Sequence, residues 1–277
     1  MKTIKRYIES FERFGFLNTL SHILSKFNIK FRFHDSIWKK RIYLSKKLNK
    51  ICEGQIIDGI YKGTKLIYSS DYFIAKPSQL LGCYEKEVQE EIYNLTKKNN
   101  LESFINLGAG EGYHTVGSKV AKLFKYFFCY ELDKSNQEII KKNFQLNGIN
   151  ENINIFSKAD TNFLKFLENK INFSKSLFLF DIEGDEFKIL DEKNINTIKN
   201  SYLIIELHHF YSSKKEVEEF YELLNKYFNI RFCKTGNRIF SKFKILDNFN
   251  DDEKWLMMSE SRPETMGWII CEPINKN

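Results

Sequence analysis

From residue 103 onward, short apolar runs alternate with longer amphipathic stretches. The runs are typical of strands, and the stretches, with apolar residues every three or four positions, are typical of helices. Because the runs are apolar throughout, we expect parallel strands covered on both faces. The predicted strands are 103–107, 125–131, 153–157, 176–181, 202–207, 230–235 and 267–273, and the predicted helices 113–123, 134–146, 161–169, 185–198 and 214–228. This alternation predicts an α/β fold with a doubly wound sheet.

The first hundred residues follow different patterns. Apolar residues recur at helical spacing through 1–51 and again through 84–99. Residues 54–70 alternate around a Lys-Gly turn, which predicts a β-hairpin at an edge of the fold. We expect three regions: a basic helical N-terminal extension (1–51), a β-hairpin and helix leading into the core (52–99), and the core itself (100–277).

The composition is typical of a globular protein, with 277 residues, 42% of them hydrophobic and 29% charged. No run approaches the ~20 apolar residues of a transmembrane helix, and the charged N-terminus lacks the apolar centre of a signal peptide. The five cysteines show no zinc-binding spacing. Their odd number predicts reduced thiols in the cytoplasm.

The net charge of +7 is concentrated near the N-terminus. Residues 1–50 hold thirteen Lys and Arg against three Asp and Glu. Such a segment is consistent with a solvated helical face, and equally with a contact to a polyanion, a membrane surface or a partner protein. We expect the protein in the cytoplasm, with the inner membrane surface as a second location. The sequence does not predict an oligomeric state.

The segment FINLGAGEGYH, residues 104–114, follows the first core strand. Its glycines let the backbone approach a nucleotide at the edge of the sheet where ligands bind. A dinucleotide loop would need a glycine where Tyr113 stands, and no Gly-Lys-Ser/Thr of a P-loop is present. The spacing therefore disfavours a nicotinamide dinucleotide. The cofactor-binding candidates here are Asn106, Gly108, Ala109, Gly110, Glu111 and Gly112.

Acidic residues follow the next two strands. Glu131 ends the second strand, 21 positions after Gly110, where a carboxylate can accept hydrogen bonds from both ribose hydroxyls of an adenosine. Leu132, the next residue, is assigned to the same site. Asp160 follows the third strand; it can either accept the adenine amino group or cap the helix predicted from residue 161.

Four segments together resemble a known family. INLGAGEGYH, CYELD, SKAD and FLFDIEGDEFKIL are similar, in order and spacing, to the motifs of class I S-adenosylmethionine-dependent methyltransferases. The last segment most resembles the FkbM-type branch, which carries Asp-x-Glu-Gly-x-Glu at the end of the fourth strand. LLGCYEKEV, residues 80–88, is also similar to a segment of some members. The resemblance spans about 80–210.

The resemblance implies a Rossmann-like sheet of seven strands with its last strand antiparallel. It implies S-adenosylmethionine as the cofactor, and methylation of hydroxyls on sugars or other small metabolites, often in polysaccharide biosynthesis. The sequence departs from the family at Asn106, where Asp is more usual. Asn keeps an acceptor and loses the charge, which leaves an inactive relative as one hypothesis.

The chemistry is expected where the fourth and fifth strands end. Methyl transfer to a hydroxyl needs alignment of the acceptor and removal of its proton. We assign Asp181, Glu183 and His208 as catalytic candidates, and Asp181 also as a cofactor-binding candidate; the alternatives are a helix cap for Asp181 and a structural role for His208. A second hypothesis is a Mg²⁺ ion held by Asp181, Glu183 and Glu206, which would lower the pKa of the acceptor.

Other polar residues are candidates for binding the acceptor. They are Tyr84, Glu85, His114, Glu206 and His209. Glu85 has a competing role at the start of a helix, where an acid suits the dipole, and His114 has one in packing.

Two rival functions remain open. The basic N-terminus suggests an RNA methyltransferase, but DIEG replaces the Asn/Asp-Pro-Pro-aromatic motif of enzymes that methylate base amines. We therefore expect a small-molecule or glycan acceptor and no nucleic acid. The other rival is a cofactor-binding or scaffolding protein without turnover.

Overall fold

The computed structural model describes residues 36–68, 76–208, 212–262 and 265–274. The chain forms two compact units, Met1–Tyr43 and Leu44–Asn277, and every element from α3 onward belongs to the second. The predicted helices before residue 36 lie outside the described residues. Within the described ranges, no helix has the length and apolar character needed to cross a lipid bilayer.

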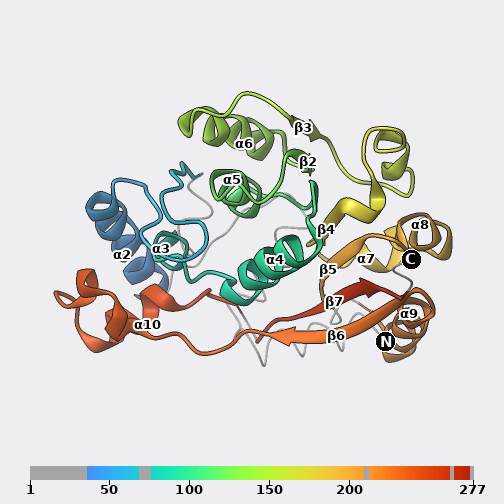
Figure 1. The fold of residues 1–277 in the computed structure, drawn as a ribbon. Helices are drawn as coiled ribbons and strands as arrows, with labels where there is room; N and C mark the ends of the chain where they lie inside the picture. Colours follow the sequence, from blue (N-terminus) through green and yellow to red (C-terminus); the bar gives the residue numbers. More distant parts are fainter. Residues whose placement is uncertain (1–35, 69–75, 209–211, 263–264, 275–277) are drawn as a thin grey trace, which may run out of the picture. The chain divides into compact units, whose positions relative to one another are not determined.

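The second unit is built on a seven-stranded sheet in the order β3-β2-β1-β4-β5-β7-β6 (Figure 1). The strands are β1 Ser103–Leu107, β2 Tyr126–Tyr130, β3 Ile153–Phe156, β4 Ser176–Phe180, β5 Tyr202–Glu206, β6 Phe228–Lys234 and β7 Gly267–Pro273. β7 runs antiparallel to both β5 and β6, and the pairings among β1 to β5 are parallel. The predicted α/β fold and its antiparallel last strand are confirmed, with β7 inside the sheet and β6 at its edge.

Helices cover both faces of the sheet. The helices of the described ranges are α2 Ser36–Cys52, α3 Lys76–Leu80, α4 Lys86–Asn99, α5 Tyr113–Val120, α6 Lys134–Leu146, α7 Glu186–Ile189, α8 Glu192–Ile198, α9 Lys214–Tyr227 and α10 Asp251–Met258. Short 3₁₀ turns are η2 Phe163–Phe166, η3 Phe173–Lys175, η5 Phe240–Lys242 and η6 Lys244–Leu246. One core lies between the sheet and α4, α5 and α6, and a second lies between the sheet and α7, α8 and α9 (Figure 1).

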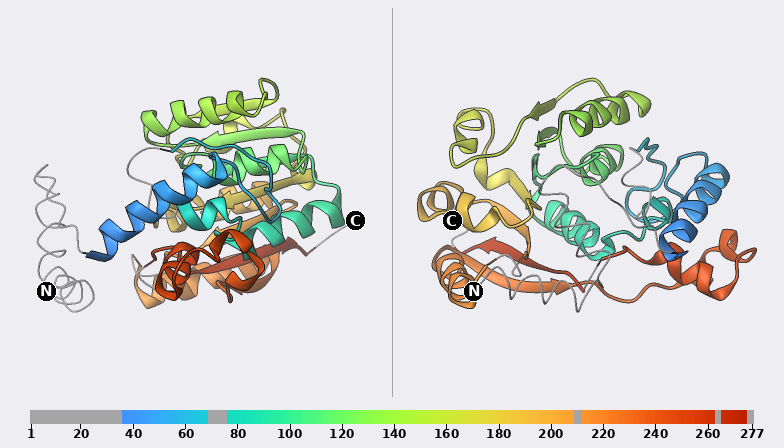
Figure 2. Two further views of the ribbon diagram at one scale, coloured as in Figure 1. Left: turned by 90° about the vertical axis from the view of Figure 1, so that its left-hand side faces the viewer. Right: turned by 180° about the vertical axis from the view of Figure 1, so that it is seen from behind.

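A smaller core joins segments that are distant in sequence. Apolar residues of α2 from Leu44 onward, of α3 and of α10 are buried against one another. Both views in Figure 2 show α10 returning beside the segment before α4. Residues 240–258 therefore pack against the part of the chain that precedes α4 and leads into the sheet.

The local signals explain several element boundaries. The Asp133 side chain accepts a hydrogen bond from the Ser135 N–H and starts α6. Ser213 and Glu216 form a capping box at the start of α9. These caps satisfy N–H groups that have no partner within the helix, so both predicted helices begin where the sequence indicates.

Three predicted elements differ from the structure. The stretch 161–169 forms the 3₁₀ turn η2, and 185–198 is divided into α7 and α8. Asp191 causes this division, because its side chain caps the second helix by accepting from the Asn194 N–H.

The predicted hairpin is the third difference. The described part of 54–70 has one isolated antiparallel bridge, between Gln55 and Lys65, and no paired strands. Side chains from α6 and from its C-cap take the place of a partner strand. The Asn147 amide bonds both the N–H and the carbonyl of Lys65, and the Asn143 amide does the same for Ile67. This backbone is therefore satisfied without a second strand.

Candidate functional site

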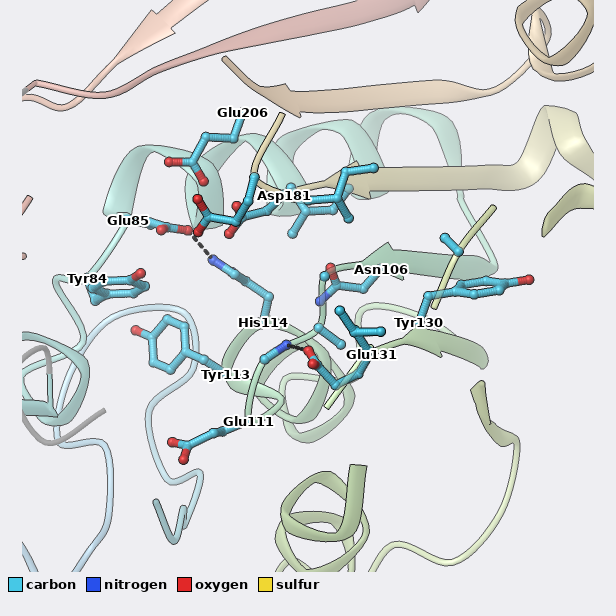
Figure 3. Close-up of a pocket in the computed structure, with 18 of the residues that line it drawn as sticks. Tyr84, Glu85, Asn106, Glu111, Tyr113, His114, Tyr130, Glu131, Asp181 and Glu206 are labelled. Carbon is cyan, nitrogen blue, oxygen red and sulfur yellow. Dashed lines mark hydrogen bonds and ion pairs between the residues drawn. The ribbon is translucent and has the colours of Figure 1, made fainter. Parts of the chain in front are cut away.

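A cavity of about 370 Å³ lies at the carboxyl ends of β1, β2, β4 and β5 (Figure 3). Its walls bring together most of the predicted site residues: Asn106, Gly108, Ala109, Gly110, Glu111, Glu131, Leu132, Asp181, Glu183, His208, Tyr84, Glu85, His114 and Glu206. Gly112 and Asp160 do not line it, and His209 lies outside the described residues. Strand ends of a parallel sheet form such crevices because successive loops diverge there.

The glycine loop between β1 and α5 has a backbone that side chains would disturb. Gly108 has φ +83°, and a Cβ there would collide with the carbonyl oxygen of Asp181. Gly110 has φ +54°, and the space that its Cβ would enter is empty. Gly112, with φ +90°, packs against Val116 at the start of α5. Gly108 therefore lets β1 and β4 lie close together, while Gly110 leaves room on the cavity side.

Glu131 braces this loop from the end of β2. Its Oε2 accepts a hydrogen bond of 2.7 Å from the Gly110 N–H, and its Oε1 accepts one of 2.8 Å from the Asp133 N–H. Burial raises the pKa of Glu131 above its ordinary value, and these two hydrogen bonds oppose the rise. A buried carboxylate is thus held at the cavity wall beside Leu132, whose side chain is 68% exposed.

Asp160 and Asn106 have local partners. Asp160 is exposed, and its carboxylate accepts a hydrogen bond from the Asn162 N–H; the helix that it was expected to cap is the 3₁₀ turn η2, whose N-cap is Asn162. Asn106 is 2% exposed, and its Nδ2 donates to Thr115 Oγ1. Among the described residues, no donor reaches Asn106 Oδ1. A buried acceptor without a partner is costly, which makes this wall of the cavity suited to a ligand with a donor.

Carboxylates gather at the other end of the cavity. Figure 3 shows the carboxylates of Glu85, Asp181 and Glu206 directed toward one another. Arg262 forms ion pairs with Glu85, Glu206 and Glu260. Its guanidinium also lies 5.7 Å from the ring centre of Tyr84, in a cation–π contact. One arginine therefore offsets part of a larger negative charge.

The pKa values of these acids diverge. Burial alone would raise the pKa of Glu85, but the effects of Arg262 and His114 outweigh burial and lower this pKa to about 2. Burial and the charge of Glu85 raise the pKa of Asp181 to about 6. Burial, Asp181 and Glu85 raise the pKa of Glu206 well above its ordinary range. Groups with separated pKa values in one cavity are typical of catalytic sites.

His208 is held from behind by a carboxylate. Its Nδ1–H donates to Glu186 Oε1 over 2.7 Å, and its Nε2 lies 3.7 Å from Asp181 Oδ1 and 3.6 Å from Glu183 Oε2. Burial lowers the pKa of His208, and Glu186 outweighs that effect and raises it. Glu183 has φ +56° and a side chain that is 76% exposed.

Glu85 and His114 form a second buried pair. His114 Nε2 lies 2.6 Å from Glu85 Oε2, and Nδ1 lies 3.1 Å from the hydroxyl of Tyr61. Glu85 stands at the start of α4, yet its side chain makes no capping hydrogen bond there. Asp181 also caps no helix, since Asp185 occupies the N-cap of α7. Glu85 and Asp181 instead line the cavity.

The donor set for a cation differs from the predicted one. Within the described ranges, Asp181, Glu206 and His208 each offer a ligand atom, and these atoms lie within 4.8 Å of one another. The sequence predicts Glu183 as the third ligand of the cation, whereas the structure has His208 in that position.

Two residues of the site were given no role by the sequence analysis. Arg262 lies in the segment before β7, outside every motif, and enters the cavity only because that segment folds over it. Glu186 belongs to the quoted DIEGDE segment, but its contact with His208 depends on the spacing of β4 and β5. The tandem acids of that segment were the one available hint.

No protein-family model matches the chain, and no characterised protein matches it either. The FkbM-type resemblance therefore stays a prediction.

Solved structures resemble the chain in fold. The human methyltransferase 10 domain containing protein gives a TM-score of 0.53 at 13% identity, covering 87% of this chain and 97% of that chain. The METTL16 MTase domain gives 0.51 at 13% identity, covering 87% and 81%. The N-terminal domain of human METTL16 gives 0.50 at 13% identity, covering 89% and 85%. The sheet and its helices thus have a Rossmann-like methyltransferase fold.

Proposed function

We propose that the protein is an S-adenosylmethionine-dependent O-methyltransferase, acting on a hydroxyl of a sugar, a glycan precursor or another small metabolite. The observation that carries the proposal is the buried Glu131 carboxylate bonded to the Gly110 N–H at the cavity wall. The methyltransferase fold of the neighbours supports it.

The cavity residues fit the cofactor. Glu131 offers a carboxylate to ribose hydroxyls, and the open space at Gly110 admits a ligand beside the loop. Asn106 Oδ1 offers a buried acceptor that no described donor fills. When bound, S-adenosylmethionine supplies a methyl group activated by a sulfonium. The acids at the far end of the cavity provide a negative field that suits this charge.

The polar cluster at the ends of β4 and β5 is suited to the acceptor. Tyr84, Glu85 and His114 line that end and can orient an alcohol by hydrogen bonds. Asp181, Glu183 and His208 surround the position where a hydroxyl proton would leave, and Glu186 fixes the ring of His208. Alignment and proton removal are the two tasks that methyl transfer to oxygen sets the protein.

The proposal is tested by release of S-adenosylhomocysteine in the presence of candidate acceptors. We expect release with hydroxyl-bearing sugars, nucleotide sugars or glycan precursors. A His208→Gln variant should bind the cofactor with unchanged affinity and turn over at least tenfold more slowly. Release with RNA and with none of the sugars would refute the acceptor class, and unchanged turnover in the variant would remove His208 from the reaction.

The inactive-relative hypothesis and the nucleic-acid hypothesis are separate outcomes of the same assay. Cofactor binding without turnover would favour the former. The basic segment behind the latter falls mostly on residues that the structure does not describe.

A further inference from the structure

Three side chains from neighbouring strand ends form a mixed nitrogen and oxygen cluster. Asp181 follows β4, Glu206 ends β5, and His208 lies two residues beyond. One ligand atom from each lies within 4.8 Å of the others. We propose that these three residues bind one divalent metal ion at the acceptor end of the cavity.

Glu206 supplies an observation that the clustering alone does not. Its side chain is 1% exposed, and Oε1 is paired with Arg262. Among the described residues, no donor reaches Oε2, although this atom is buried. The carboxylate is directed toward that of Asp181 (Figure 3). Two acids that face each other without a donor between them are unfavourable unless a cation or a shared proton joins them.

The orientation of His208 fits a metal ligand. Glu186, itself buried, accepts from Nδ1 over 2.7 Å, which turns Nε2 toward the carboxylates. A carboxylate on the far ring nitrogen is the usual support of a metal-binding imidazole. Nε2 lies 3.7 Å from Asp181 Oδ1, too far for a hydrogen bond. Two ligands that bind one ion at ~2.1 Å each are separated by up to about 4.2 Å, which includes this distance.

The donor set selects the class of ion. Two carboxylates with one imidazole suit Mn²⁺ or Zn²⁺ better than Mg²⁺, since carboxylates suit Mn²⁺, imidazole suits Zn²⁺, and Mg²⁺ favours oxygen alone. Three protein ligands leave coordination positions for the acceptor. Glu183 is outside the set and mostly exposed.

The role of the ion rests on the proposed function, whereas its binding does not. An acceptor hydroxyl bound to the ion would have a lowered pKa. Its proton would pass to Glu183 and on to solvent, the new C–O bond would form, and the C–S bond of the cofactor would break. This refines the catalytic assignment: Asp181 and His208 act as ligands, and Glu183 takes the proton.

The test measures Mn²⁺ binding to the metal-free full-length protein by calorimetry and electron paramagnetic resonance. We expect one site per chain. Affinity should fall at least tenfold in each of Asp181→Asn, Glu206→Gln and His208→Gln. It should be unchanged in Asp185→Asn, a matched control on the same turn whose carboxylate pairs with Lys158 and Lys188. Thermal unfolding of each variant verifies that it is folded.

A second measurement needs only the wild-type protein. Pulsed resonance of bound Mn²⁺ should show coupling to one nitrogen, which changes when the histidines carry ¹⁵N. Absence of saturable binding of Mn²⁺ and of Zn²⁺ would overturn the proposal, as would equal affinity in all variants or binding without nitrogen coupling. Calorimetry with S-adenosylmethionine on the same samples is independent, so failure of the metal site and failure of the proposed cofactor are distinguishable.

Discussion

Replacing Glu131 with glutamine tests the proposed cofactor site with little change in side-chain shape. The carboxylate uses both oxygens as acceptors, one for the Gly110 N–H and one for the Asp133 N–H. An amide can accept with its oxygen only, and its NH₂ group would face the other N–H. The same limitation applies to ribose hydroxyls that donate to this side chain.

The magnitude follows from the hydrogen bonds involved. A hydrogen bond to a charged group contributes about 1.5–3 kcal/mol. In Glu131→Gln, one hydrogen bond from a ribose hydroxyl would be lost and another weakened. The affinity for S-adenosylmethionine should therefore fall by about 2–3 kcal/mol, or roughly 30- to 150-fold. The pKa of Glu131 is raised, so wild-type affinity should fall as the pH decreases through that raised value. The variant should lack this dependence.

Isothermal titration calorimetry from pH 4.5 to 8 measures both effects. Glu138→Gln is the control, because this acid is exposed on α6 and pairs with Lys141. Its affinity should equal that of the wild type. Equal affinity in Glu131→Gln, or the same pH dependence as in the wild type, would refute the placement of ribose at this carboxylate.

Three further predictions concern the cavity walls. Gly110→Ala should lower stability by only about 1 kcal/mol and abolish cofactor binding. Gly108→Ala should instead lower the unfolding temperature, because the new Cβ would meet the backbone of Asp181. Calorimetry measures the first effect and thermal melts measure the second. The pKa of Glu85 is lowered to about 2, so its ionisation should contribute about 3 kcal/mol to the free energy of unfolding at pH values above the ordinary pKa. This contribution should be lost as the pH falls from about 4.5 toward 2, and denaturant titrations of Glu85→Gln should not show the loss. Asn106→Asp should destabilise the unliganded protein by a few kcal/mol at neutral pH, because within the described ranges Thr115 is the side chain that would pair with the buried charge; added cofactor should restore part of this stability, and an unchanged unfolding free energy would contradict the prediction.

Much of the fold could be predicted from the periodicity of apolar residues. The run at 103–107 is β1 with the same bounds, and the stretch 134–146 is α6 with the same bounds. These elements have strong local signals: continuous burial in one case, and an Asp cap with an amphipathic face in the other. The segment 161–169 lacks such signals and forms a 3₁₀ turn.

The site was predictable to the extent that it follows the strand ends. Glu131, Asp181 and Glu206 each end or follow a strand of the parallel sheet, so topology alone brings them to one edge. Arg262 reaches the cavity through tertiary packing of a segment without regular structure, which no local pattern records. The choice of His208 over Glu183 as a ligand depends on side-chain position, because Glu183 has a left-handed backbone and a mostly exposed carboxylate that lies beside His208 but outside the set of ligand atoms.

Calorimetry of the wild-type protein with S-adenosylmethionine and with S-adenosylhomocysteine tests the central proposal most directly. We predict binding of both ligands at one site per chain, and a less favourable binding enthalpy in Glu131→Gln. Absence of binding by either ligand to the folded protein would contradict the account.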